Sequence, residues 1–134
     1  MSPVFADTFY FVAFLNPQDE HHARVRQLSR QLRRRVVTTS WILTEVADAL
    51  CDPVNRPLAG QLRQLVAASP FIRVQPAEEE LFQAGFDFFE ARPDKEWSLT
   101  DCISFVVMER ERMTEALTGD RHFEQAGFTA LLKS

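Results

Sequence analysis

The sequence predicts an α/β protein built around a parallel β-sheet. Short apolar runs of strand length alternate along the chain with longer stretches of helical periodicity, which is the pattern of βαβ units. The 134 residues can bury a substantial core, and fractions of 46% hydrophobic and 25% charged residues are ordinary for a globular protein. No repeat, low-complexity stretch or long linker interrupts the pattern, so we expect one domain over residues 1–134.

Five short apolar runs are the predicted strands. The first precedes Asp7, the second is the β-branched run Val36–Thr39, and the third follows Pro70. The fourth lies just before Asp120, and the last follows Gly127. The predicted strands are residues 3–6, 36–39, 71–74, 116–118 and 128–132.

Seven helices are predicted from the spacing of apolar residues and from residues that begin or end helices. The stretch 8–15 is apolar nearly all round and should be buried, whereas 19–35 is amphipathic and rich in arginine. Ser40 is expected to cap the third helix. Pro76 is expected to open the fifth, with three glutamates in its first turn, where the helix dipole favours negative charge. The predicted helices are residues 8–15, 19–35, 40–52, 58–68, 76–92, 99–113 and 121–125.

The composition also excludes some classes of protein. No segment approaches the roughly 18 to 20 uninterrupted apolar residues that span a bilayer, so we expect no membrane partner. Residues 1–7 lack the basic and long apolar regions of a signal peptide, which favours a cytoplasmic protein. Cys51 and Cys102 are isolated, and we interpret both as small buried hydrophobic residues instead of zinc ligands or a disulfide framework.

The net charge of −4 at first argues against a nucleic acid as partner. Without the four acids of the candidate site described next, 15 acidic residues remain against 15 Lys and Arg. Divalent cations bound at the site would offset its own charge. Electrostatics therefore leaves the question open.

Four acidic residues lie near the ends of predicted strands. Asp7 directly follows the first strand, and Asp120 lies two residues after the end of the fourth. Glu45 lies about a turn and a half into the helix after the second strand, and Asp101 lies in the first turn of the helix before the fourth. Functional groups in open parallel sheets collect outside the carboxyl ends of the strands. Four distant stretches can therefore bring their carboxylates to one edge.

Each acid also has an ordinary structural explanation. Asp7 and Asp120 could be N-caps, Asp101 could complete a capping box that starts at Ser98, and Glu45 could be a solvated helix residue. Together these explanations weaken, because apolar neighbours predict that the helices of Glu45 and Asp101 are largely buried. Buried carboxylates without basic partners are costly, whereas a hard divalent cation binds oxygen ligands. The sequence therefore predicts a divalent metal site.

Such a site can support phosphodiester cleavage. Two divalent ions can activate a water molecule and stabilise the leaving oxygen without a general base from the protein. No Ser-His-Asp order or reactive cysteine setting offers another route. His122, two residues after Asp120, is a further candidate, although a structural role is favoured for it.

Four segments carry a family resemblance. They are Asp7-Thr8 after a short strand, TSWILTE at 39–45, SLTDCISF at 98–105 and LTGDRHF at 117–123. In this order they resemble the PIN domain, and they look most like the VapC-type toxins of bacterial toxin–antitoxin pairs. The resemblance covers nearly the whole chain. It implies a three-layer α/β/α sandwich with a short central parallel sheet.

The resemblance also implies a Mg²⁺- or Mn²⁺-dependent endoribonuclease that cleaves RNA phosphodiester bonds and leaves a 5′-phosphate. The catalytic metal ligands would be Asp7, Glu45, Asp101 and Asp120. Asp7 and Asp101 would be the principal ligands, and Asp120 would be weaker or water-mediated. Thr8 and Thr118 match hydroxyl positions that often support the acids.

The expected partners are RNA, a small cognate antitoxin and a second copy of the chain. Toxins of this type are usually dimers and are held inactive by an antitoxin encoded beside them. A homodimer is also suggested by the apolar helix surface around Phe86, Phe88 and Phe89, which exceeds what one sheet can cover. No base-reading motif identifies the RNA.

Other protein classes fit less well. A haloacid dehalogenase phosphatase needs a second Asp two residues after the first, where this chain has Phe9, and a receiver domain needs paired acids, where Ala6 precedes Asp7. The non-enzymatic alternative is a catalytically silent PIN-like module that binds RNA or protein through the Phe-rich helix 81–89 or the Arg-rich helix 24–35. Four intact acids favour the enzyme, because a binding module has no need to keep them together.

Overall fold

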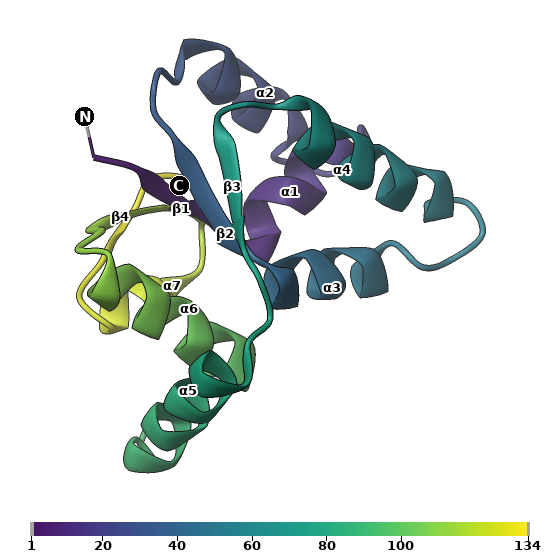
Figure 1. Ribbon diagram of the computed structural model, residues 1–134. Coiled ribbons are helices and arrows are strands. Elements are labelled where there is room, and N and C mark those ends of the chain that lie inside the picture. The colour runs from purple at the N-terminus through teal and green to yellow at the C-terminus, as the bar shows by residue number, and fades with distance from the viewer. Residues whose placement is uncertain (1, 134) are drawn as a thin grey trace.

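Five parallel strands form one sheet in the order β3-β2-β1-β4-β5 (Figure 1). The structure is a computed structural model that describes residues 2–133. The strands are β1 (Val4–Ala6), β2 (Val36–Thr39), β3 (Ile72–Gln75), β4 (Glu115–Leu117) and β5 (Thr129–Ala130). The helices are α1 (Thr8–Leu15), α2 (His22–Gln31), α3 (Ser40–Ala49), α4 (Arg56–Ala68), α5 (Glu79–Ala91), α6 (Leu99–Arg110) and α7 (Arg121–Gln125).

The helices cover both faces of this sheet. Helices α1 to α4 lie on one side, and α5 to α7 lie on the other (Figure 1). The predicted α/β fold with a parallel sheet between helical layers is therefore confirmed. The core is apolar on both sides, with β1 fully buried and Phe11, Met108 and Phe123 completely inaccessible to solvent. Among the described helices, none combines the length and the apolar character needed to cross a membrane.

The strand order creates a switch point between β1 and β4. These neighbours pair in parallel, with Phe5 opposite Ala116 and Ala6 opposite Leu117. The helix after β1 packs on one face of the sheet, whereas the helix after β4 packs on the other. Backbones that diverge in this way leave a crevice at the carboxyl ends of the strands, where ligands of open α/β sheets bind.

The predicted cap of one helix and the predicted start of another were wrong. Thr39, the last residue of β2, caps α3 by accepting a hydrogen bond from Ile42 N at 3.1 Å, and Ser40 is already the first helical residue. Helix α5 begins at Glu79 instead of Pro76. In both cases the helix begins where the extended backbone turns. Neighbouring residues are equally suitable as caps, so the sequence does not fix this position.

One boundary of each of two long helices was also predicted wrongly. Helix α2 starts late because Asp19 accepts a hydrogen bond from His21 N in a turn. Helix α6 ends at Arg110 because Arg112 adopts a left-handed conformation with a φ of 56°. The other differences are small: α2 ends at 31, α3 ends at 49, α4 starts at 56, and strands β3, β4 and β5 span 72–75, 115–117 and 129–130.

Two further expectations about burial need correction. Cys102 is buried as predicted, but Cys51 is exposed just after α3. Phe86 and Phe89 are exposed on α5 as expected, but Phe88, which was expected to share that apolar surface, packs against Trp97 with a centroid separation of 5.6 Å. The turn between α3 and α4 and the packing of α5 on α6 decide these outcomes, and neither follows from apolar spacing alone.

Candidate metal centre

Asp7 and Asp120 lie together at the switch point between β1 and β4. The Thr118 hydroxyl donates a hydrogen bond to Asp7 Oδ2 at 2.9 Å and accepts one from Asp120 N at 3.0 Å. This threonine is fully buried directly after β4. It therefore connects the residue after β1 to the residue that opens α7. Asp7 occupies the N-cap position of α1 but makes no side-chain cap hydrogen bond, so capping does not explain this acid.

Glu45 reaches the same edge from α3. The Thr8 hydroxyl, in the first turn of α1, donates a hydrogen bond to Glu45 Oε1. Thr8 is adjacent to Asp7, so this contact places the α3 carboxylate beside the first acid. Negative charge on Glu45 is one of the influences that raise the pKa of Asp7. Both threonines expected to support the acids thus donate to carboxylates in the structure.

Asp101 is both a helix cap and a member of the cluster. Its backbone N–H donates to Ser98 Oγ at 3.0 Å, and its Oδ2 accepts from Ser98 N at 3.3 Å, so the capping box is present. The same Oδ2 lies 3.0 Å from His122 Nδ1. Negative charge on Asp101 also raises the pKa of Asp7. The capping explanation is therefore correct for one carboxylate oxygen, and it leaves Oδ1 available.

A structural role was favoured for His122 from the sequence, but its ring contacts the candidate metal ligands. Its backbone N–H donates to Asp120 Oδ1 at 2.9 Å, and its ring nitrogen Nδ1 lies 3.6 Å from the same oxygen. The ring thus contacts carboxylates from the end of β4 and the start of α6. The available signal was the Asp120-x-His122 spacing, which puts the histidine in the first turn of a helix that the acid caps.

Burial makes this cluster electrostatically unusual. Asp7 is 5% exposed, and burial, followed by smaller contributions from Asp101 and Glu45, raises its pKa to about 7. Burial also raises the pKa of Asp101, and the charge of Asp120 adds to this effect. Among the described residues, no Lys or Arg forms an ion pair with any of the four acids. The fold therefore gathers negative charge around the buried Asp7 and Asp101 and provides, within residues 2–133, no Lys or Arg ion pair to balance it.

Each of the four carboxylates accepts a hydrogen bond from the protein. One oxygen of each accepts a hydrogen bond from a protein donor: Asp7 Oδ2 from Thr118, Glu45 Oε1 from Thr8, Asp101 Oδ2 from Ser98 and His122, and Asp120 Oδ1 from the His122 backbone. Within residues 2–133 the second oxygens of Glu45, Asp101 and Asp120 accept no hydrogen bond of this kind, whereas the Asp7 carboxylate has a further contact from the Thr8 backbone N–H. Donors that hold one oxygen and leave the other free are typical of metal-ligating carboxylates.

This donor set fits a hard divalent cation. Ligand atoms of Asp101, Asp120 and His122 lie within 4.8 Å of one another, and this group does not include Asp7 or Glu45. Carboxylate oxygens with water in the remaining positions are what Mg²⁺ and similar ions prefer. A bound cation would also supply the positive charge that the buried Asp7 lacks. The residues present therefore fit a divalent metal ion.

The Arg-rich segment lies apart from these acids. Arg24 donates to Leu132 O at 2.8 Å, Arg26 donates to Phe14 O at 3.0 Å, and Arg34 forms an ion pair with Glu115. Residues 33–35 lead into the start of β2, at the opposite edge of the sheet from the carboxyl ends. The interpretation of this helix as an ordinary solvated face fits better than an RNA-binding role.

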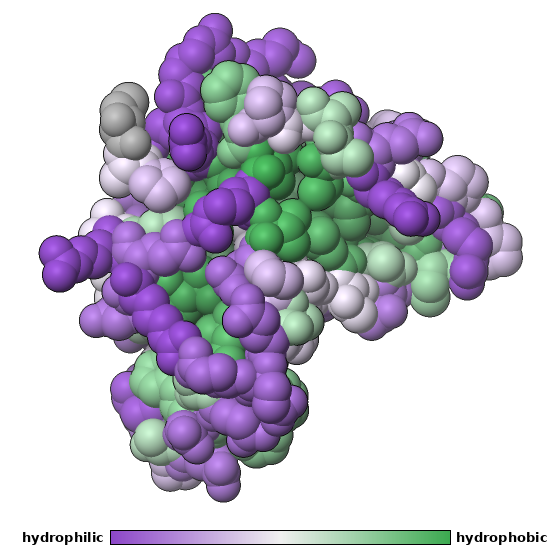
Figure 2. All heavy atoms as spheres, viewed as in Figure 1, coloured by the Kyte–Doolittle hydropathy of each residue, from purple (hydrophilic) through white to green (hydrophobic). Residues whose placement is uncertain are grey.

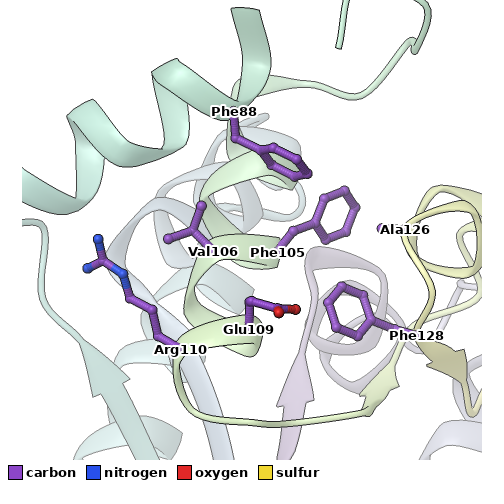
Figure 3. A pocket seen from close by; sticks show the side chains of 7 residues that line it. All are labelled: Phe88, Phe105, Val106, Glu109, Arg110, Ala126 and Phe128. Atoms are coloured by element: carbon purple, nitrogen blue, oxygen red, sulfur yellow. The ribbon is translucent and has the colours of Figure 1, made fainter. Parts of the chain in front are cut away.

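The larger hollows of the surface also lack the acids. One, of about 440 Å³, lies along the C-terminal half of α6 (Figure 3) and is lined by Phe88, Phe105, Val106, Glu109, Arg110, Ala126 and Phe128. Another of about the same volume lies between α2, α4 and β3, where Figure 2 shows apolar atoms in a hollow between polar rims. Volume and apolar lining therefore do not mark the place where the charged chemistry is concentrated.

Comparisons with known proteins agree with this architecture. The sequence model of the PIN domain matches residues 4–129. A protein of Mycobacterium tuberculosis named "23S rRNA-specific endonuclease VapC20" is 27% identical over 128 residues, which cover 93% of this chain and 95% of the relative. The crystal structure of M. tuberculosis VapC20, described as a sarcin–ricin loop cleaving toxin, superimposes with a TM-score of 0.87 at 23% identity over 96% of this chain and 98% of that one. FitAcB from Neisseria gonorrhoeae gives a TM-score of 0.63 at 18% identity over 95% and 94%.

Proposed function

This chain belongs to the PIN domain family, and on that premise we propose that it is a divalent-metal-dependent endoribonuclease. The observation that supports the proposal is the set of four carboxylates near the switch point, each oriented through one oxygen by a protein donor. Asp7 and Asp101 are the most buried of the four and would be the principal ligands. Glu45 and Asp120 would complete the site.

The residues around the carboxylates do the positioning. Thr8 holds Glu45, and Thr118 holds Asp7 while it also binds the backbone of Asp120. Divalent ions bound there would activate a water molecule and stabilise the leaving oxygen of the phosphodiester. Burial of the cluster strengthens electrostatic interactions at the reacting phosphate, because little water is present to screen them. We propose Mg²⁺ or Mn²⁺, since the available ligand atoms are oxygens.

RNA is the proposed substrate class. It is supported by the name of the 27% identical relative, a 23S rRNA-specific endonuclease that matches this chain over almost its whole length. Ribosomal RNA is therefore the first substrate to test. We further propose that the chain acts in the cytoplasm as the toxin of a toxin–antitoxin pair. A cognate antitoxin is expected to be a small protein that co-purifies with the chain and suppresses cleavage when both are present.

Purified protein incubated with ribosomal RNA tests the activity. Cleavage should occur with Mg²⁺ or Mn²⁺, stop in excess chelator and resume when metal is restored. Asp7→Asn should abolish it. Asp87→Asn, which removes the same charge from an exposed position on α5, should not change it. Cleavage that persists in chelator would contradict the proposal, and RNA binding without cleavage in either metal would favour the silent binding module.

We also propose a homodimer that involves the exposed face of α5. Phe86 and Phe89 are 36% and 40% exposed, and with Phe82 they form a continuous row of edge-on rings with centroid separations of 5.7 and 5.8 Å. A second copy of the same face would cover this row. Light scattering should report about twice the 15.4 kDa chain mass. The double variant Phe86→Lys, Phe89→Lys should be a monomer, and a wild-type monomer at every concentration would refute the proposal.

A further inference from the structure

We infer that His122 is a positioning residue that orients two carboxylates of the metal centre, Asp101 and Asp120, from a single turn of α7. The inference rests on the proposed metal-dependent function. It assigns to this histidine the role of a hydrogen-bond donor to the ligands and not that of a ligand.

The geometry shows two separate contacts from one residue. The backbone N–H of His122 donates to Asp120 Oδ1 at 2.9 Å, and the ring nitrogen Nδ1 lies 3.0 Å from Asp101 Oδ2. Asp101 belongs to the first turn of α6, whereas Asp120 lies between β4 and α7. The imidazole is largely enclosed, with 20% of its side chain exposed. His122 therefore connects two elements that reach the crevice independently.

The partners of Asp101 Oδ2 determine which way the hydrogen bond runs. An ionised carboxylate accepts hydrogen bonds and cannot donate them, so Nδ1 must carry the proton in this contact. A protonated Nδ1 has no lone pair to offer to a metal ion. Because Nδ1 lies 3.0 Å from Oδ2, donation and coordination by this nitrogen exclude each other. Nδ1 of the histidine in the Asp101, Asp120 and His122 group is thus a donor to a ligand, and the Zn²⁺ comparison below tests whether its other ring nitrogen, Nε2, binds a cation.

Asp101 needs such a donor because the other hydrogen bond that its Oδ2 accepts is long. The capping contact from Ser98 N is 3.3 Å, beyond the usual range for a good N–H···O bond. Without His122, this contact alone would define which carboxylate oxygen turns towards the crevice. With His122, Oδ2 is held from two sides, and Oδ1 would remain for a cation. Outer donors of this kind raise metal affinity by keeping the ligand in its binding orientation.

The measurement is the Mn²⁺ dissociation constant of metal-free protein, obtained by calorimetric titration at one pH. His122→Ala should weaken Mn²⁺ binding by about 10- to 100-fold, the usual effect of removing an outer-shell donor. His122→Asn should restore most of the affinity, since its amide nitrogen can occupy the place of Nδ1. His122→Phe keeps a ring but has no donor, and it should bind as weakly as His122→Ala. All three variants keep the backbone contact to Asp120.

His22→Ala is the matched control. The His22 ring also makes a hydrogen bond through Nδ1, at 2.7 Å, but to the Ala13 carbonyl at the far end of α1. Its loss removes a comparable contact without touching a carboxylate. The Mn²⁺ affinity should be unchanged in this variant, and melting in chelator reports the folding of every variant. If His122→Ala does not fold, the comparison of His122→Asn with His122→Phe decides the question.

Zn²⁺ separates positioning from ligation. Zinc favours imidazole nitrogen far more than Mn²⁺ does, so a histidine ligand would make His122→Ala lose much more affinity for Zn²⁺ than for Mn²⁺. If His122 is a positioning residue, His122→Ala should weaken the binding of Mn²⁺ and of Zn²⁺ by the same factor. His122→Asn should restore the binding of both ions. A selective loss of Zn²⁺ binding, or unchanged Mn²⁺ binding in His122→Ala, would overturn the inference. Wild-type protein that binds no Mn²⁺ would instead refute the proposed metal site itself.

Discussion

The two ends of α6 face opposite environments. Its first turn carries the Ser98–Asp101 capping box and meets His122, so that polar groups are buried there in hydrogen-bonded positions. Its C-terminal half presents Phe105 and Val106 to a half-open apolar pocket of about 440 Å³ (Figure 3). Within the described part of the chain, the aromatic end is a hollow without a buried carboxylate, whereas the polar end buries charge without a Lys or Arg partner. Buried acids of this kind cluster at functional sites, so the polar end is the candidate site.

The largest expected effect is the difference in RNA cleavage between a variant at the polar end of α6 and one at the aromatic end. Asp101→Asn should reduce RNA cleavage by about 10²- to 10³-fold, the usual effect of losing one preorganised electrostatic group. Phe128→Leu, in the wall of the aromatic pocket, should lower the melting temperature because it loses ring packing on Phe105. Its cleavage rate per folded molecule should be unchanged. Rates measured with ribosomal RNA and Mn²⁺ test both variants, and an inactive but folded Phe128→Leu would place substrate contacts at the aromatic end.

The second prediction concerns the free energy of unfolding without metal, as a function of pH. Burial raises the pKa of Asp7 from the ordinary value of 3.8 to about 7 in the folded protein. At low pH the group is protonated in both states and costs nothing. As pH rises above about 4 the unfolded state ionises first, so folding is penalised progressively until pH 7 and by a constant amount above it.

Asp7→Asn removes this penalty, because asparagine is neutral and its amide oxygen can still accept from Thr118. In chelator, the difference in the free energy of unfolding between the variant and the wild type should grow from about pH 4 to pH 7. It should favour the variant by up to about 4 kcal/mol at pH 8. Mn²⁺ should reduce the difference at pH 8 because it stabilises only the complete site. Urea unfolding across this pH range provides the measurement. A difference that does not change with pH would mean that Asp7 is ordinarily acidic in the fold.

The third prediction tests the helix packing that holds both ends of α6 in place. A Cβ atom on Gly85 of α5 would overlap Ile103 Cγ1 and lie 3.1 Å from Ile103 Cα, so Gly85→Ala should destabilise the protein by roughly 1–3 kcal/mol. Gly60→Ala on α4 is the matched control, since nothing lies within 4 Å of the added atom. It should stabilise the protein by about 0.5–1 kcal/mol through helix propensity. Equal effects in urea unfolding would show that α5 and α6 are not closely packed at this crossing.

The smallest expected effect distinguishes helix capping from metal binding at the polar end of α6. Ser98→Ala removes the hydrogen bond that Ser98 Oγ accepts from Asp101 N and should cost about 1 kcal/mol of stability. The loss should be the same in chelator and in Mn²⁺, because the hydroxyl holds a backbone N–H and no carboxylate oxygen. Asp101→Asn should instead lose the stabilisation that Mn²⁺ provides. Thermal melts in both conditions compare them, and a Ser98→Ala protein that no longer responds to Mn²⁺ would show that capping and ligation are one function.

Local physics made much of the fold readable from the sequence. The β-branched run Val36–Thr39, the apolar helix Thr8–Leu15 and the short helix Arg121–Gln125 occur at their predicted bounds. These elements are defined by side-chain branching, apolar periodicity and an acid at the N-cap, which act within a few residues. Helix boundaries such as the start of α2 and the end of α6 were less predictable, because a turn hydrogen bond from His21 N to Asp19 and a left-handed Arg112 decide them.

The sequence alone also determined which acids were candidates, since strand ends and missing basic neighbours are visible in it. Their roles as metal ligands remain a prediction for the experiments above. Whether Asp101 was a cap or a member of the cluster could not be decided from the Ser98-x-x-Asp101 pattern. The structure shows that one oxygen can cap while the other stays free. A capping motif describes backbone hydrogen bonds, and it does not specify what the rest of the carboxylate faces.

Only the tertiary structure decided which distant side chains meet. The contact of His122 with Asp101 spans 21 residues, and the contact of Thr118 with Asp7 spans 111. Both depend on β4 lying beside β1, an arrangement set by the sheet order β3-β2-β1-β4-β5 and not by any local pattern. Strand order results from the burial of the whole sheet between its two helical layers, which is a property of all the elements together. For that reason the acids could be named in advance, while the donors that orient them could be identified in full only in the folded chain.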